Sequence, residues 1–335
     1  MGIKNLNKFI REKCQNSIKC ISIADLRDKT IAVDISIYIY KYHTEEMLLE
    51  NIYLMITIFR HYGANPIFVF DGKPPTEKKA LLAQRKIDKV SAKNEFNKLK
   101  EQLYLDKDIS EQDRQEIVSS MDVLKKQFVS IKKEQIEGVK SLIHACGMNW
   151  IDAPGEADQM CAYMVQENSA WACMSDDMDM FVYGMDRVLR YFSLMNHTAV
   201  LYDMQSILKE LDLSQKEFQQ ICILSGTDYN QETSLSWSSS SLSLYEIYNN
   251  FRIYKKKEIE VQETNDDFYS WIIQMYPNSK INYENLVQIQ QLFETKDLYL
   301  GVGIGDISKS LNKTNAKPLE MNKIKALLEP EGFFF

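Results

Sequence analysis

Seven carboxylates occur in five short motifs, and each motif follows an apolar run that is typical of a buried strand. The densest motifs are APGEAD, which begins at Ala153, and SDDMD, which begins at Ser175. Acids that lie close together in a protein repel one another unless a cation or water reaches them. Carboxylate oxygens are preferred ligands of Mg²⁺. The sequence therefore predicts a metal site formed by Asp34, Asp71, Glu156, Asp158, Asp177, Asp179 and Asp228.

Three of these acids end or follow single apolar runs. Asp34 ends TIAVD, Asp71 follows PIFVF, and Asp228 lies in GTDYN. A lone aspartate after a strand is more often a turn or helix cap. Ligands of open parallel sheets, however, bind outside the carboxyl ends of the strands. The recurrence of acids at five such places favours a shared site over five separate caps.

The elements that must position these acids alternate between strand and helix patterns. Strands are expected at 30–34, 66–70, 148–151 and 170–174, with an antiparallel pair at 188–192 and 199–202. Helices are expected from 35 to about 61, through 76–135 with a break near 105–110, and at 134–146, 155–167 and 214–225. This alternation predicts an α/β fold with a mostly parallel central sheet and helices on both faces.

Charge is distributed unevenly over the 335 residues, whose net charge is −7. Between Lys78 and Lys140 there are 15 basic and 11 acidic residues. A basic segment on an acidic chain is typical of an insertion that contacts phosphates, and a solvated helical hairpin is the alternative. We expect a core at 1–230 with a helical insertion at about 76–135, followed by a helical C-terminal region at 231–335.

Six cysteines and four histidines show no metal-ligand spacing. Three of the cysteines lie in apolar runs, which is typical of small core residues in a reducing, intracellular compartment. No stretch reaches the ~18 apolar residues that a membrane-spanning helix needs, so no membrane partner is expected.

Taken in order, the motifs MGIKNL, VFDGKPP, APGEAD, SDDMD and GTDY resemble those of the flap endonuclease/XPG family, from Met1 to about Asn230. The resemblance implies the PIN-like 5′-nuclease fold with a helical arch. It implies an Mg²⁺-dependent endonuclease or 5′–3′ exonuclease that hydrolyses DNA bearing a 5′ flap, nick or gap, in replication, repair or recombination. The chain is similar to divergent homologues of large DNA viruses or of other A·T-rich genomes. We expect a monomer, in the nucleus or at a viral replication site in the cytoplasm.

The resemblance also implies roles for individual residues. The acids would hold two Mg²⁺ ions, for which Mn²⁺ could substitute; we expect Glu156, Asp158 and Asp179 to bind directly, and Asp34, Asp71 and Asp228 through water. Asp176 matches an acidic position that is not usually a ligand. Lys78 and Arg85 match a catalytic basic pair at the foot of the arch, Tyr40 matches an aromatic that stacks on a base, and Gly2 matches a small residue beside the DNA.

Two departures from the family pattern stand out. Asp158 replaces a glutamate, and NQETSLSWSSSSLSL replaces the usual GIGP-type turn that grips duplex DNA. We therefore expect the C-terminal basic run to bind duplex, with a solvated helix face as the alternative. The run comprises Arg252, Lys255, Lys256 and Lys257.

Other activities remain open at this point. The usual Q-x-x-[ILM]-x-x-FF segment for a sliding clamp is absent, so the sequence does not decide whether a clamp binds. The alternative functions are a 5′–3′ exonuclease or RNase with the same core, and a non-catalytic DNA-binding recombination factor.

Overall fold

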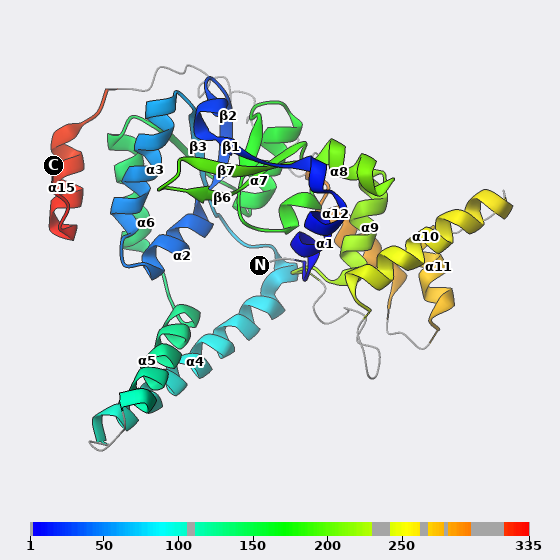
Figure 1. The fold of residues 1–335 in the computed structure, drawn as a ribbon, viewed down its shortest axis with the longest axis horizontal. Helices are drawn as coiled ribbons and strands as arrows, with labels where there is room; N and C mark the ends of the chain where they lie inside the picture. The colour runs from blue at the N-terminus through cyan, green and yellow to red at the C-terminus, as the bar shows by residue number, and fades with distance from the viewer. Residues whose placement is uncertain are drawn as a thin grey trace.

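A sheet in the order β1-β7-β6-β5-β2-β3-β4 runs through the centre of the computed structural model (Figure 1). The structure describes residues 3–105, 111–229, 242–261, 267–277, 281–295 and 318–334. The strands are β1 (Ile18–Ser22), β2 (Thr30–Asp34), β3 (Asn65–Phe70), β4 (Asn149–Asp152), β5 (Ala172–Met174), β6 (Arg187–Ser193) and β7 (Thr198–Asp203).

Strand pairing agrees with the predicted mostly parallel sheet. The pairs β2–β3, β2–β5, β3–β4 and β5–β6 are parallel, whereas β6–β7 and β1–β7 are antiparallel. Strand β1 is absent from the sequence-based prediction. It is an edge strand whose side chains are half-buried or exposed, so it lacks the alternation of apolar and polar residues that identifies a strand in sequence.

Helices cover both faces of the sheet, because successive strand residues point to opposite sides. In β2, Ile31 and Val33 pack on one face and Ala32 on the other. The first face carries α2 (Ile35–Thr44), α3 (Leu48–Tyr62), α6 (Lys133–Ala145) and α15 (Met321–Leu328). The second carries α1 (Leu6–Lys13), α7 (Ala157–Gln166), α8 (Met204–Leu211) and α9 (Gln215–Ser225). Helices α10 (Leu244–Val261), α11 (Phe268–Met275) and α12 (Tyr283–Leu292) continue this second core.

Two helical predictions need correction. The single helix expected from 35 to about 61 is two helices, because the chain turns between α2 and α3, with Glu46 in the left-handed region at φ 60°. Helix α8 is a further element that the sequence patterns do not predict; Asp203 caps it by accepting a hydrogen bond from the Ser206 N–H at 2.8 Å.

The predicted insertion forms a helical hairpin that projects from the core (Figure 1). Helices α4 (Lys79–Leu105) and α5 (Glu111–Gln127) pack along each other, and the break predicted near 105–110 falls between them; residues 106–110 lie outside the described part. Lys125 on α5 pairs with Glu46, and Gln135 on α6 contacts His43, so the far limb of the hairpin is anchored beside α2. We call α4 and α5 the arch.

The C-terminal region is helical where the structure describes it, as predicted. The expected boundary near 230 falls at residues 230–241, which lie outside the described part. Across the described ranges, every helix is either too short or too polar to cross a membrane.

Candidate active site

The acidic residues lie at the carboxyl end of β2, where the chain continues to β3 on one side of β2 and later to β5 on the other. Strand β2 lies between β3 and β5, which it pairs in parallel, so the carboxyl ends of these three strands meet at one edge. Asp34 ends β2, Asp71 follows β3, and Asp177 follows β5 by three residues. This edge is where open α/β sheets bind ligands.

A close backbone contact joins the VFDG and APGEAD motifs. Gly72 N–H donates to the Gly155 carbonyl at 2.7 Å, and a Cβ at Gly72 would lie 1.9 Å from the Ala153 carbonyl oxygen. Only glycine fits there. Asp71 Oδ1 then accepts from the Ala157 N–H at 2.8 Å, at the positive N-terminal end of α7. The contact therefore places Asp71 beside Glu156 and Asp158.

The SDDMD segment is held by short polar contacts. Ser175 Oγ donates to Asp34 Oδ2 at 3.0 Å and accepts from the Asp177 N–H at 3.2 Å. Asp177 Oδ1 accepts from the Asp179 N–H at 3.2 Å. Among the residues that the structure describes, Asp179 Oδ1 is buried without a hydrogen-bond partner. A buried carboxylate oxygen without a partner is costly, so this atom is a candidate cation ligand.

Asp34, Asp158 and Asp179 have raised pKa values, and the charges of the other four acids contribute to these shifts. Burial raises the pKa of Asp34, and the charges of Asp71, Asp158 and Asp177 raise it further. Burial also raises the pKa of Asp179, and Asp177 and Asp228 add to that shift. Burial raises the pKa of Asp158 to about 7, Lys78 opposes this shift, and Glu156 adds to it. The predicted cluster is therefore assembled in the fold.

The positive charge among these acids comes from the foot of the arch. Lys78 Nζ lies 2.8 Å from both carboxylate oxygens of Glu156, and Arg85 Nη2 donates to Asp228 Oδ2 at 2.8 Å. Burial alone would lower the pKa of Lys78, but Asp158 and Glu156 raise it overall. Lys78 is only 7% exposed, so it is not a solvated surface lysine.

The donor set suits a hard divalent cation, because it consists of carboxylates, one of which has an unpartnered oxygen. In the ranges that the structure describes, no three His, Cys, Asp or Glu side chains stand in an arrangement that could hold a metal. The acids would therefore have to turn, or to bind an ion through water, and Lys78 would have to release Glu156.

Two other residues singled out from the sequence do not contact the acid cluster in the described part of the structure. Tyr40 on α2 is 45% exposed, with Lys89 Nζ 5.7 Å from its ring centroid. Asp176 faces away from the cluster: its Oδ1 accepts from the Tyr191 N–H at 2.8 Å. Gly2 lies outside the described residues.

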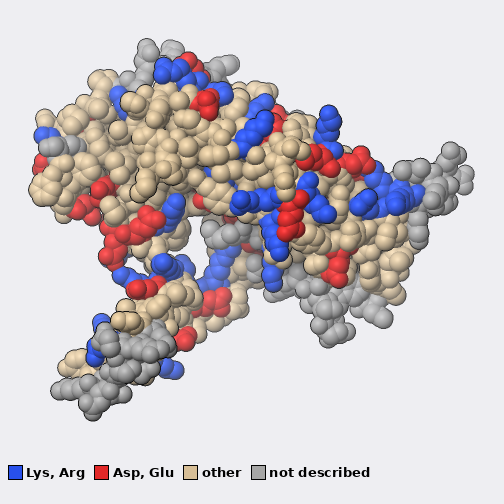
Figure 2. Space-filling model, in the orientation of Figure 1, with Lys and Arg blue, Asp and Glu red and all other residues tan. Residues whose placement is uncertain are grey.

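The basic run on α10 is only partly free. Lys255 Nζ lies 3.4 Å from a carboxylate oxygen of Asp212 and 3.8 Å from one of Glu217. Arg252 and Lys256 are exposed, and the side chain of Lys257 lies outside the described part. Figure 2 shows Lys and Arg side chains over α10 and along the side of the core that faces the arch.

Two tyrosines at the cluster were missed by sequence reasoning. The Tyr229 hydroxyl donates to Glu156 at 3.0 Å, and the Tyr183 hydroxyl donates to Asp158 at 3.2 Å. Tyr229 could have been identified from the sequence, since it directly follows Asp228 in the GTDY motif. Tyr183 had none, because an aromatic residue in the apolar run MFVY resembles any core residue.

A mostly parallel sheet with an acidic cluster at its carboxyl edge, and a helical arch above it, defines the PIN-like 5′-nuclease class. Two family models match this chain: the XPG N-terminal domain over residues 1–92 and the XPG I-region over residues 147–228. Together they span just over half of the chain, and all seven acids lie within them. The chain belongs to the flap endonuclease/XPG family.

Curated relatives include flap endonuclease 1 of Trypanosoma brucei gambiense, which is 30% identical over 68% of this chain and 61% of the relative. Flap endonuclease 1 of Cryptosporidium parvum is 26% identical over 86% of this chain and 63% of the relative. The chain thus spans about three fifths of the length of these relatives.

Solved structures support the fold over nearly the whole chain. The catalytic core of Rad2 in complex with a DNA substrate matches with a TM-score of 0.64 at 19% identity, covering 99% of this chain and 96% of that catalytic-core chain. Human GEN1 bound to Holliday junction DNA matches with a TM-score of 0.56 at 18% identity, covering 99% of this chain and 73% of GEN1.

Proposed function

We propose that this protein is a metal-dependent, structure-specific 5′ nuclease that hydrolyses phosphodiester bonds in DNA bearing a 5′ flap, nick or gap. One observation carries the proposal: seven mutually repelling carboxylates from five segments share one edge of the sheet, directly below a basic arch. Repulsion between neighbouring carboxylates destabilises the folded protein unless a bound cation offsets it, so the cluster indicates cation binding. Membership of the flap endonuclease/XPG family supports the same function.

Two divalent ions, Mg²⁺ or Mn²⁺, would supply Lewis-acid stabilisation of the scissile phosphate and a water of lowered pKa. Glu156, Asp158 and Asp179 are the acids that we propose as direct ligands, because Asp179 has an unpartnered oxygen and the other two border Lys78. Asp34 accepts from Ser175 and Asp71 from the Ala157 N–H, and we propose that these two acids, together with Asp228, contact the ions through water.

The arch contributes cations of its own. Lys78 and Arg85 reach the acid cluster from the start of the arch, so a phosphate at this edge would lie within reach of both. Arg85 can present two parallel donors to a phosphate, whereas Lys78 acts as a point charge. When metal and substrate bind, Lys78 and Arg85 would separate from Glu156 and Asp228. Their positive charges could then stabilise the negative charge that develops on the phosphate in the transition state.

The exposed side chains around the cluster can receive the rest of the DNA. Tyr40 offers an accessible ring, and stacking on a base is worth about 1–3 kcal/mol. All six cysteines are free, which fits our proposal that the protein works in a reducing compartment, in the nucleus or at a viral replication site. We further propose that it works as a monomer.

The test is cleavage of 5′-labelled substrates with Mg²⁺ and with EDTA. A 5′-flap duplex, a nicked duplex, a gapped duplex and a single-stranded RNA should be compared, and product lengths mapped. We expect cleavage near the junction of the flap, and none in EDTA. Asp186→Ala serves as the matched control, because Asp186 contacts Gln205 and takes no part in the acid cluster.

The product pattern separates the alternative functions. Release of mononucleotides from a nick without flap cleavage would indicate a 5′–3′ exonuclease, and preference for the RNA would indicate an RNase. DNA binding without cleavage in either Mg²⁺ or Mn²⁺ would contradict the proposal in favour of a non-catalytic binding factor.

A further inference from the structure

The carboxylate of Asp158 is held at both of its oxygens. Oδ1 accepts from the Gln159 N–H at 2.7 Å, and Oδ2 accepts from the Tyr183 hydroxyl at 3.2 Å. A tyrosine hydroxyl carries its proton at neutral pH, so it can act as the donor in this contact. Each carboxylate oxygen can accept a second partner. The two bonds thus fix the orientation of Asp158 and leave room for a cation.

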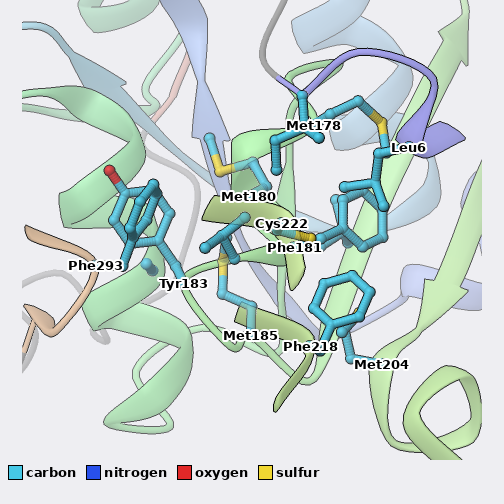
Figure 3. Packing of buried hydrophobic residues seen from close by; sticks show 14 of the residues in the cluster. Leu6, Met178, Met180, Phe181, Tyr183, Met185, Met204, Phe218, Cys222 and Phe293 are labelled. Carbon is cyan, nitrogen blue, oxygen red and sulfur yellow. The ribbon is translucent and has the colours of Figure 1, made fainter. Parts of the chain in front are cut away.

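The ring of Tyr183 is fixed by a residue of the C-terminal region. Phe293, directly after α12, lies with its ring centroid 4.9 Å from that of Tyr183 and 5.3 Å from that of Tyr229. Phe293 is 1% exposed, and Figure 3 shows its ring packed against the ring of Tyr183. One buried phenylalanine therefore supports both tyrosines that donate to the acids of APGEAD.

The backbone at Tyr183 is tied to the same region. Gln166 Nε2 donates to the Tyr183 carbonyl at 2.6 Å, and the buried Thr295 hydroxyl donates to Gln166 Oε1 at 2.5 Å. Residues 293–295 thus reach Tyr183 through its ring and, by way of Gln166, through its carbonyl. Two independent contacts restrict the tyrosine more than either would alone.

We propose that Tyr183 and Phe293 are positioning residues for the metal site, which makes residues 283–295 of the C-terminal region part of its architecture. This inference rests on the proposed metal-dependent function. Asp158 is one methylene shorter than glutamate, so it has fewer orientations in which it reaches an ion. A hydroxyl donor held in place by Phe293 selects among those orientations before any ion binds, as outer partners of metal ligands commonly do.

The experiment compares Tyr183→Phe, Phe293→Leu and Phe293→Ala with two controls. Tyr269→Phe removes a buried hydroxyl of α11 that has no hydrogen-bond partner in the described part of the chain. Phe268→Leu alters a buried ring of the same region that packs on Phe251, Tyr254 and Trp271, away from Tyr183. The first measurement is thermal unfolding of the DNA-free protein at increasing Mn²⁺. The second is single-turnover flap cleavage at increasing Mg²⁺.

Tyr183→Phe is expected to raise the half-saturating Mn²⁺ and Mg²⁺ concentrations by roughly 10–100-fold, the usual effect of losing an outer partner of a ligand. The cleavage rate should recover at saturating Mg²⁺, since the chemistry is unchanged. Phe293→Ala should shift the half-saturating concentrations in the same direction and Phe293→Leu by less. Tyr183→Phe combined with Phe293→Ala should shift them by less than the sum of the single effects on a logarithmic scale, because part of the Phe293→Ala effect passes through the Tyr183 hydroxyl. The controls should leave the ion titration unchanged.

An unchanged Mn²⁺ titration in Tyr183→Phe would overturn the inference, and so would an equal shift in Tyr269→Phe or Phe268→Leu. If Phe293→Ala does not fold, Tyr183→Phe and Phe293→Leu decide the matter alone. Absence of any Mn²⁺ stabilisation of the wild-type protein would also overturn it. Failure of the nuclease proposal is seen separately, as wild-type protein that binds Mn²⁺ but cleaves no substrate.

Discussion

Asp179 is the acid that a cation would stabilise most directly. In the described part of the chain, one of its carboxylate oxygens is buried without a hydrogen-bond partner, and other acids surround it. Asp177 differs, because its Oδ1 already accepts from the Asp179 N–H. The two acids of one motif therefore contribute differently: Asp179 offers a free oxygen, whereas Asp177 both shapes the turn and adds negative charge.

At the residue scale, Asp179→Asn and Asp177→Asn should each lower single-turnover cleavage to below roughly 1% of the wild-type rate. Flap affinity measured in Ca²⁺ should change little, because the arch and other basic surface still contact the DNA backbone. Asp179→Asn should also raise the thermal midpoint in EDTA, since it removes one of several repelling charges. Cleavage near the wild-type rate, with Asp186→Ala as the reference, would show that these acids hold no catalytic metal.

At the scale of the element, the arch is anchored to the acid cluster at its foot and beside α2 at its far limb. The foot makes two ion pairs of different character. Lys78–Glu156 is buried, whereas Arg85 is 40% exposed in its pair with Asp228. Removing one partner of a buried pair leaves an uncompensated charge, while an exposed pair contributes little to stability.

Lys78→Ala and Arg85→Ala should each slow single-turnover cleavage by roughly 10²–10³-fold, the effect of losing one transition-state donor. Flap affinity should fall far less than the rate. Lys78→Ala alone should lower the thermal midpoint in EDTA, because the partly buried Glu156 then loses its cation, and Mg²⁺ should restore the midpoint. Lys86→Ala, at an exposed lysine next to Arg85, is the control. Equal reductions in rate and affinity would mean that Lys78 and Arg85 only bind DNA.

The ion pairs of helix α10 indicate which of its basic residues are available to bind duplex DNA. Arg252 and Lys256 are exposed, whereas Lys255 is paired with Asp212 and Glu217. Arg252→Ala with Lys256→Ala should weaken binding to every duplex-containing substrate. It should also reduce the log–log salt slope by ~0.9 for each phosphate that the protein no longer neutralises. Lys255→Ala should change that slope little. A double variant with unchanged affinity and slope would identify this run as a solvated helix face.

At the scale of the whole molecule, divalent ions should stabilise the folded protein, since the metal site that we propose exists only when the fold brings the acids together. A ligand at 100 times its Kd stabilises by about 2.7 kcal/mol, which is readily seen as a rise in thermal midpoint. Mg²⁺, Mn²⁺ and Ca²⁺ should each raise the midpoint of the wild-type protein. Asp177→Asn combined with Asp179→Asn should abolish most of that rise. An equal rise in the double variant would place ion binding elsewhere.

The same ions should differ in turnover. Mn²⁺ should replace Mg²⁺ in cleavage, whereas Ca²⁺ should permit DNA binding without cleavage, because Ca²⁺ takes more oxygens at longer distances. Cleavage in Ca²⁺ at a rate comparable to that in Mg²⁺ would contradict a magnesium site built from these acids.

Much of the site could be predicted because its signals are local. An apolar run followed by an acid identifies the end of a strand, and parallel strands bring such ends to one edge. Asp34, Asp71 and Asp177 meet for this reason. The two helix-covered faces follow equally from alternating strand and helix periodicity. Edge strand β1 was not predicted, because a half-exposed strand shows no clear alternation of apolar and polar residues in the sequence.

Local patterns in the chain were sufficient for the fold class, since it depends on periodicity within short segments. They also singled out the acids that the fold brings together; that these acids hold metal stays a prediction. The partners of the acids became known only from the packed fold. Glu156 pairs with Lys78 across 78 positions of the chain, and Asp228 pairs with Arg85 across 143. Phe293 reaches Tyr183 from a separate helical region. Such pairings depend on how distant elements pack, and packing selects partners by shape and burial that no local pattern records.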